Sequence, residues 1–166
     1  QTTGNSVTLT GAGSFTMNTM TVKAGALATT ISGTPVAQNV IAGVQSFTFS
    51  NVQLDASQSG EDVRLSALPI RMTGTIADLS SCRLFNGSTQ LTTGSNVPSS
   101  LSSSGTATTF TLDNSLVIAK GTVTTLALKC NVTSSVSAGT YIWSVNSGDT
   151  WSPTGVTSGV SISESF

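Results

Sequence analysis

Apolar and polar residues alternate along most of this chain, and the alternation is clearest between residues 46 and 73. Phe47 and Phe49 begin an apolar face, the pattern shifts by one position, and Val52 and Leu54 continue it. After the turn-rich ASQSG segment the alternation resumes at Val63, Leu65, Leu68, Ile70 and Met72. Period-two alternation predicts strands with one buried face, and each shift predicts a bulge or a crossing between sheets. We therefore expect a β-hairpin over residues 46–73, in the core of a β-sandwich.

The same alternation predicts shorter strands on both sides of this segment. They cover residues 79–85, 107–112, 116–118, 122–132, 141–145 and 159–166, with a short edge strand beginning at Val36. Asn86-Gly87 is a strong hairpin signal, and we expect the return strand to begin at residues 90–92. No segment repeats its apolar residues with the 3.6-residue period of a helix, so no significant helix is expected. The fold class expected is all-β, as an antiparallel sandwich rather than a barrel.

Residues 1–34 form a separate segment in this interpretation. Apolar residues occupy alternate positions in two runs, at Val7, Leu9, Phe15 and Met17 and then at Met20 and Val22. Lys23 is the only charged residue before Pro35, and the proline marks a break between two segments of the chain. We expect residues 1–34 to be an extended apolar arm and residues 35–166 to be the sandwich domain.

Composition removes several classes of function. The chain has no histidine, so catalytic triads with a histidine base and the usual zinc and copper sites are not expected. Its six basic residues are scattered along the sequence, which argues against nucleic-acid binding. No apolar run is long enough to span a membrane. We expect no enzyme activity and no cofactor. Because only 8% of residues are charged and the net charge is −1, copies of the chain repel one another little.

Two cysteines, Cys82 and Cys130, have the parity of inward-facing residues on two predicted strands. The chain begins at Gln1 with neither Met nor a signal peptide, as a mature secreted protein does. In an oxidising compartment, inward cysteines on neighbouring strands often form a disulfide between the two sheets. We expect this disulfide and an extracellular location, with two buried free thiols as the alternative.

A few surface residues are candidates for other chemistry. Asn86 and Asn131 lie in N-x-S/T sequences, and the outward parity of Asn131 suits a glycan. Trp151 and Phe166 are candidates either for the core or for contacts with a neighbouring molecule, and the loop position of Trp151 suits an interface, whereas Trp143 is expected in the core.

Three carboxylates, Asp55, Glu61 and Asp62, flank one loop and offer oxygen ligands to calcium. The favoured alternative is a solvated loop in which Glu61 or Asp62 pairs with Arg64 or Arg83.

The segments GEDVRL, ADLSSCRLFNGSTQL and IAKGTVTTLALKCNV resemble immunoglobulin-like β-sandwich domains of prokaryotic secreted surface proteins. The resemblance runs from Pro35 to Tyr141 and implies an immunoglobulin-like sandwich. Domains of this kind build surface layers, adhesins and filaments. The N-terminal arm lies outside this resemblance and is similar to the donor strands of pilus subunits.

Together these features predict a structural subunit of an extracellular filament or surface array. The arm would add as a strand to the next copy, so that copies of the chain are its partners and the polymer is head-to-tail. The alternative is a monomeric adhesin or carbohydrate-binding module in which Tyr141 and Trp151 line a ligand site.

Overall fold

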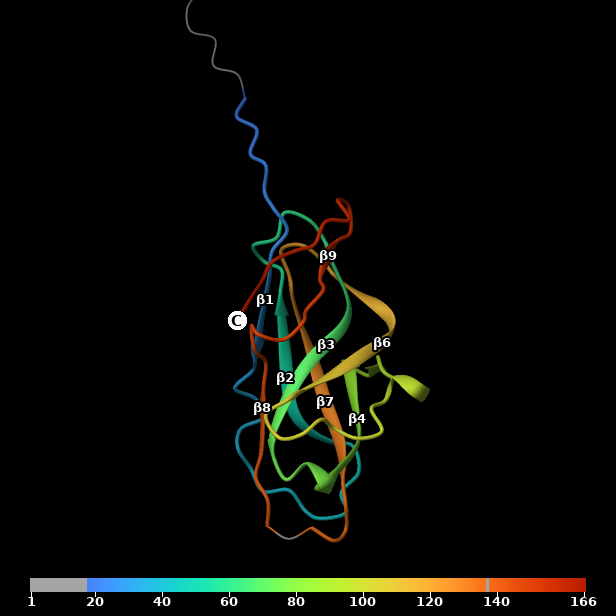
Figure 1. Ribbon diagram of the computed structural model, residues 1–166. Coiled ribbons are helices and arrows are strands. Elements are labelled where there is room, and N and C mark those ends of the chain that lie inside the picture. The colour runs from blue at the N-terminus through green and yellow to red at the C-terminus, as the bar shows by residue number, and fades with distance from the viewer. Residues whose placement is uncertain (1–17, 137) are drawn as a thin grey trace, which may run out of the picture.

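The computed structural model describes residues 18–136 and 138–166, and they form an all-β sandwich of two sheets (Figure 1). The strands are β1 (Leu27–Ile31), β2 (Phe47–Asp55), β3 (Val63–Gly74), β4 (Leu79–Asn86), β5 (Thr89–Gln90), β6 (Ala107–Ile118), β7 (Val123–Val132), β8 (Tyr141–Ser144), β9 (Thr154–Gly155) and β10 (Glu164–Ser165). Two short 3-10 turns, η1 (Ile76–Asp78) and η2 (Gly94–Asn96), are the only helical elements among the described residues. The all-β prediction is confirmed.

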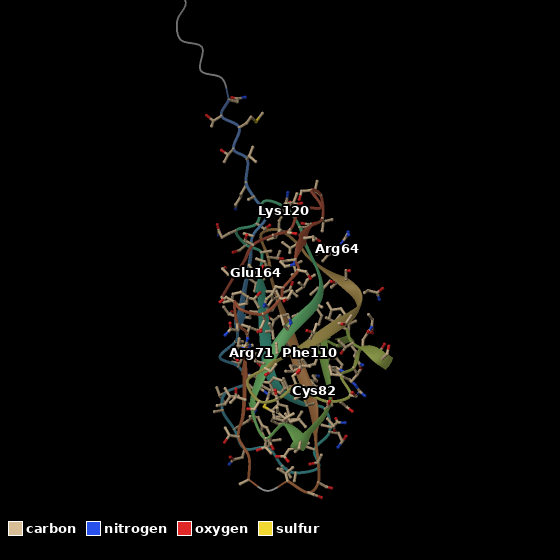
Figure 2. The ribbon with its side chains drawn as sticks, in the orientation of Figure 1. Arg64, Arg71, Cys82, Phe110, Lys120 and Glu164 are labelled. Carbon is tan, nitrogen blue, oxygen red and sulfur yellow. A yellow bond between two sulfur atoms is a disulfide. The ribbon has the colours of Figure 1, made fainter. Side chains whose placement is uncertain are left out.

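One sheet has six strands in the order β10-β1-β2-β7-β4-β5. The other has the order β6-β3-β8, and β9 also pairs with β3. All neighbouring strands are antiparallel except β1 and β10, which run parallel. The alternation places one face of each long strand between the sheets, where Phe110 is the largest fully buried side chain (Figure 2). Its neighbours in the core include Val52, Leu68, Ile70 and Leu126, each with no exposed surface.

The predicted hairpin over residues 46–73 is wrong in its pairing. Both strands exist, but β2 pairs with β1 and β7, whereas β3 pairs with strands of the other sheet. Residues 56–62 therefore carry the chain from one sheet to the other. Alternation shows which side chains of a strand are buried. It is the same whether two strands are hydrogen-bonded neighbours in one sheet or face each other from opposite sheets, so it could not distinguish these arrangements.

The predicted boundary at residue 35 is too late. Strand β1 lies inside the segment expected to be an arm, but it pairs with β2 over Ala28 to Ile31 and is part of the sandwich. The edge strand expected from Val36 is a loop. Two other predicted strands, 107–112 and 116–118, form the single strand β6, with a register shift opposite Leu65 and Ala67.

The chain enters the sandwich beside the loop between β2 and β3. The amide of Gly60 donates to the carbonyl of Ala24 at 2.9 Å, and the amide of Ala26 donates to the Ser59 hydroxyl at 3.2 Å. Before these contacts the described chain leads away from the sandwich (Figure 1). Met20 and Val22 are 89% and 97% exposed. The apolar side chains of Met20 and Val22, before the first strand, therefore lie in solvent.

Cys82 and Cys130 form a disulfide, as predicted. They lie on β4 and β7, which are neighbours in the six-stranded sheet, so the bond joins two strands of one sheet and not the two sheets. The register of β4 and β7 shifts between Ser80 and Arg83, and this irregularity contains Cys82. Both cysteines are buried.

Candidate functional site

A groove opens between the two sheets at the end of the sandwich opposite the arm. Its volume is about 740 Å³. Three segments line it: the loop between β1 and β2, the first residues of β2, and the chain from the end of β7 into β8. These loops gather at the lower end of the molecule in Figure 1, whereas the arm leaves the upper end. The described part of the arm and the groove are therefore at opposite ends of the long axis.

Aromatic rings form the inner wall of this groove. Phe49 is central to them, with ring centroids 5.1 Å from Phe47, 5.6 Å from Tyr141 and 6.2 Å from Trp143. In each of these three pairs the ring planes are tilted or edge-on, which is a favourable arrangement for aromatic side chains. Phe47, Phe49 and Tyr141 are only half-buried, and all three line the groove. The groove thus presents apolar surface that the described residues leave uncovered.

Two polar atoms in the groove lack partners among the described residues. The indole Nε1 of Trp143 and the hydroxyl of Ser50 are both buried and make no hydrogen bond there. An unpaired buried polar group costs about 1–3 kcal/mol. Both atoms lack accessible surface, so a guest in the groove would reach them only if the surrounding side chains moved.

A free strand edge borders the same groove. Strand β8 pairs with β3 on one side, through Arg71 to Gly74, and is the last strand of its sheet. Its other edge has no strand partner among residues 18–136 and 138–166. An unpaired edge next to an apolar groove is the arrangement that accepts an added strand.

Tyr141 connects the groove to the turn η1. Its hydroxyl donates to Oδ2 of Asp78 at 2.9 Å. Burial, together with the hydrogen bond to Asp78 and the negative charge of that carboxylate, raises the pKa of Tyr141 to about 12. The native state therefore holds this proton more tightly than the unfolded chain, whose tyrosine pKa is about 10. The stabilisation is complete below about pH 10 and is lost as the pH rises toward about 12.

This shift can be measured directly, because Tyr141 is the only tyrosine in the sequence. Phenolate absorbance followed against pH should give a midpoint near 12 for the native protein. In Asp78→Asn the carboxylate charge is removed and the midpoint should fall, while Asp113→Asn, which alters a carboxylate elsewhere, should leave it unchanged. A native midpoint near 10, the ordinary tyrosine value, would contradict the Tyr141–Asp78 contact.

The candidate interface residues have different outcomes. Val7, Leu9, Phe15 and Met17 lie outside the described residues. Trp151, a candidate for the core or for an interface, is 7% exposed, because it packs into the core. Phe166 packs against it in an edge-on arrangement, with a centroid distance of 5.4 Å, and is itself 43% exposed. Trp151 does not line the groove.

The two candidate glycosylation sites also differ. Asn86 is exposed in the β4–β5 hairpin, where it pairs with Thr89 around Gly87, whose φ is +59°. This confirms the predicted turn. Asn131 is half-buried, and its Oδ1 accepts a hydrogen bond from the amide of Ser46 at 2.8 Å. Asn86 is therefore the more accessible of the two.

The acidic loop makes backbone contacts and not the expected pairs with Arg64 or Arg83. Oε2 of Glu61 accepts the amides of Thr157 and Ser158, each at 2.9 Å, and Oε1 accepts the Ser158 hydroxyl at 2.6 Å. These hydrogen bonds, chiefly those from Ser158, lower the pKa of Glu61. Asp62 accepts the amide of Lys120 at 2.9 Å. Glu61 and Asp62 thus hold two neighbouring loops in place, at the end of the sandwich where the arm leaves.

Residues 18–136 and 138–166 offer neither a metal site nor a membrane-spanning helix. They contain no group of three or more His, Cys, Asp or Glu side chains close enough to hold a metal ion. They also contain no helix with the length and apolarity needed to cross a membrane.

Comparison with known proteins yields no relative for this chain. It matches no family model, no curated protein and no solved structure.

Proposed function

We propose that this protein is a structural subunit of an extracellular filament or surface array, which polymerises when the arm of one copy enters the groove of the next. The observation that carries the proposal is the position of two complementary features at opposite ends of one sandwich. Exposed apolar arm residues leave one end, and an open aromatic groove with a free strand edge lies at the other.

The arm is suited to this role by its sequence. An extended chain places alternate side chains on one side, so Val7 and Leu9, and later Phe15 and Met17, would face the same wall of a groove. Burial of an apolar side chain contributes about 1.5–3 kcal/mol, and the backbone hydrogen bonds of an added strand contribute further, against a cost of about 1–2 kcal/mol for each residue that becomes ordered. The exposure of Met20 and Val22 leaves that stabilisation unused within one copy.

The groove is suited to receive a strand and not only apolar groups. A guest strand beside β8 supplies backbone amides and carbonyls, which satisfy the free edge of β8. Because donor and acceptor are different surfaces at opposite ends, the contact is heterologous and forms open chains. The near-neutral chain, with a net charge of −1, does not oppose this packing.

An extracellular location is part of the same proposal. The buried disulfide between Cys82 and Cys130 supports it, because disulfides persist in oxidising compartments. The alternative of a monomeric carbohydrate-binding module has less support, since Trp151 is buried and lies outside the groove that Tyr141 lines.

Two substitutions in one loop test whether the groove is the acceptor. Val36 and Ile41 are 69% and 80% exposed, and only Val36 lines the groove. Val36→Glu places a charge where the guest strand must pack, so we expect it to abolish polymers. Ile41→Glu makes the same change of charge outside the groove and should polymerise like the wild type.

The measurement is sedimentation velocity, with negative-stain microscopy of the same samples. Circular dichroism establishes that both variants are folded. Equal polymerisation of the two variants would show that the groove is not the site of assembly.

A further inference from the structure

Two basic residues that are far apart in the sequence face each other across two strands. Arg83 on β4 and Lys129 on β7 are register partners in the six-stranded sheet. Their chain neighbours Leu84 and Leu128 are also partners and are fully buried. Since alternate residues of a strand point to opposite faces, Arg83 and Lys129 both lie on the outer face of the sheet.

Neither cation has an acidic partner. All seven Asp and Glu residues of the sequence lie within the described residues, yet the only ion pair within 4.0 Å there is Arg71–Asp149. Nε of Arg83 is buried and makes no hydrogen bond in the described part of the chain. The ammonium of Lys129 lies over the Phe85 ring, 4.6 Å from its centroid, which holds the charge in place without neutralising it.

This arrangement is unfavourable in an isolated subunit, because like charges directly opposite on neighbouring strands destabilise a sheet. The chain has only six basic residues, and two of them occupy this one pair of positions. An oxyanion between them would remove the repulsion and would give the Arg83 guanidinium a bidentate partner.

We propose that Arg83 and Lys129 bind the carboxylate or sulfate groups of an acidic polysaccharide. They lie on the outer face of a sheet and not in a cleft, so an extended polymer can cross them without entering a pocket. A two-cation footprint on a chain of net charge −1 is too small for nucleic acid, which requires a larger basic surface. Because a single oxyanion can bridge the two cations, one charged group of the polymer is enough to occupy the pair. This site is separate from the groove and does not depend on assembly.

The test measures binding of the full chain to immobilised polysaccharides. Polygalacturonate offers carboxylates, dextran sulfate offers sulfates, and neutral dextran offers neither. Arg83→Gln/Lys129→Gln should weaken binding to the preferred acidic polymer by about tenfold or more, the loss of about one charged hydrogen bond. The matched control is Arg64→Gln/Lys120→Gln, which removes the same charge. Arg64 and Lys120 lie toward the arm end of the sandwich, away from Cys82, the chain neighbour of Arg83 (Figure 2).

The control pair should lose less than about twofold, because charges more than a Debye length away are screened. Equal losses in the two double variants would overturn the proposal, as would binding to neutral dextran or to neither acidic polymer. Tighter binding to polyglutamate than to both acidic polysaccharides would overturn the choice of a glycan.

A second readout tests the repulsion itself. Without any polymer, Arg83→Gln/Lys129→Gln should raise the midpoint of thermal unfolding, and in the wild type the acidic polymer should do the same. A lower midpoint in the variant would show that the pair stabilises the fold by itself and needs no ligand.

Discussion

Replacing the apolar residues of the arm with serine is expected to leave the full-length protein monomeric. The substituted positions are Val7, Leu9, Phe15, Met17, Met20 and Val22. Met20 and Val22, the two that the structure describes, precede the first described strand, which begins at Leu27. Since each buried apolar side chain contributes about 1.5–3 kcal/mol, loss of all six removes most of the driving force for strand addition.

The matched control for the arm keeps its apolar residues and changes polar ones. Thr8→Ser, Thr16→Ser and Thr21→Ser alter the same segment without affecting the apolar positions, and this variant should still polymerise. Light scattering with size-exclusion chromatography gives the mass of each species. Polymers of wild-type length from the all-serine arm would show that the arm does not drive assembly.

Loss of the disulfide is expected to have the largest effect on the stability of the single domain. Cys82 and Cys130 are separated by 48 residues, and a closed loop of this length lowers the entropy of the unfolded chain by an amount worth about 4 kcal/mol. Cys82→Ala/Cys130→Ala should therefore reduce the free energy of unfolding by about that amount, measured by urea denaturation. An entire domain of this kind is typically stable by only about 5–15 kcal/mol, so the variant will be marginal.

The wild type in reducing buffer is the control for this experiment. It keeps both sulfur atoms but lacks the bond, so its loss of stability comes from the greater entropy of the unfolded chain alone. The alanine variant adds the cost of a small cavity. The two samples should lose similar stability. A loss below about 1 kcal/mol in both would show that the bond constrains the unfolded chain far less than its loop length implies.

The alternation of apolar and polar residues predicts which face of a strand is buried, but it does not predict which strands pair. It identified the buried faces of β2 and β7 correctly, because burial at Val52, Leu54, Leu126 and Leu128 follows directly from parity. It could not identify the partner of β2, since pairing depends on residues distant in the chain. The assumed hairpin with β3 was wrong for this reason, and so was the expectation that the disulfide joins two sheets.

The groove could not be predicted from the sequence. Trp143 lies about a hundred residues after Val36 and Phe49, and no local pattern shows that the three line one groove. The sequence left Trp151 open between the core and an interface, because it lies in a loop without alternation, and only the structure shows that it packs into the core beside Phe166.

The pairing of Arg83 with Lys129 was missed for a related reason. Six basic residues look scattered along the sequence, and only the register of β4 and β7 brings two of them together. A prediction of that register would have revealed the pair.

The central claim is that the arm of one copy occupies the groove of another, and mixing two defective variants tests it most directly. The all-serine arm variant keeps an intact groove, and Val36→Glu keeps an intact arm. Each should be monomeric alone. When they are mixed, sedimentation velocity should show a one-to-one dimer and nothing larger, because only one arm and one groove remain functional. Absence of that dimer, with both variants folded, would contradict the account.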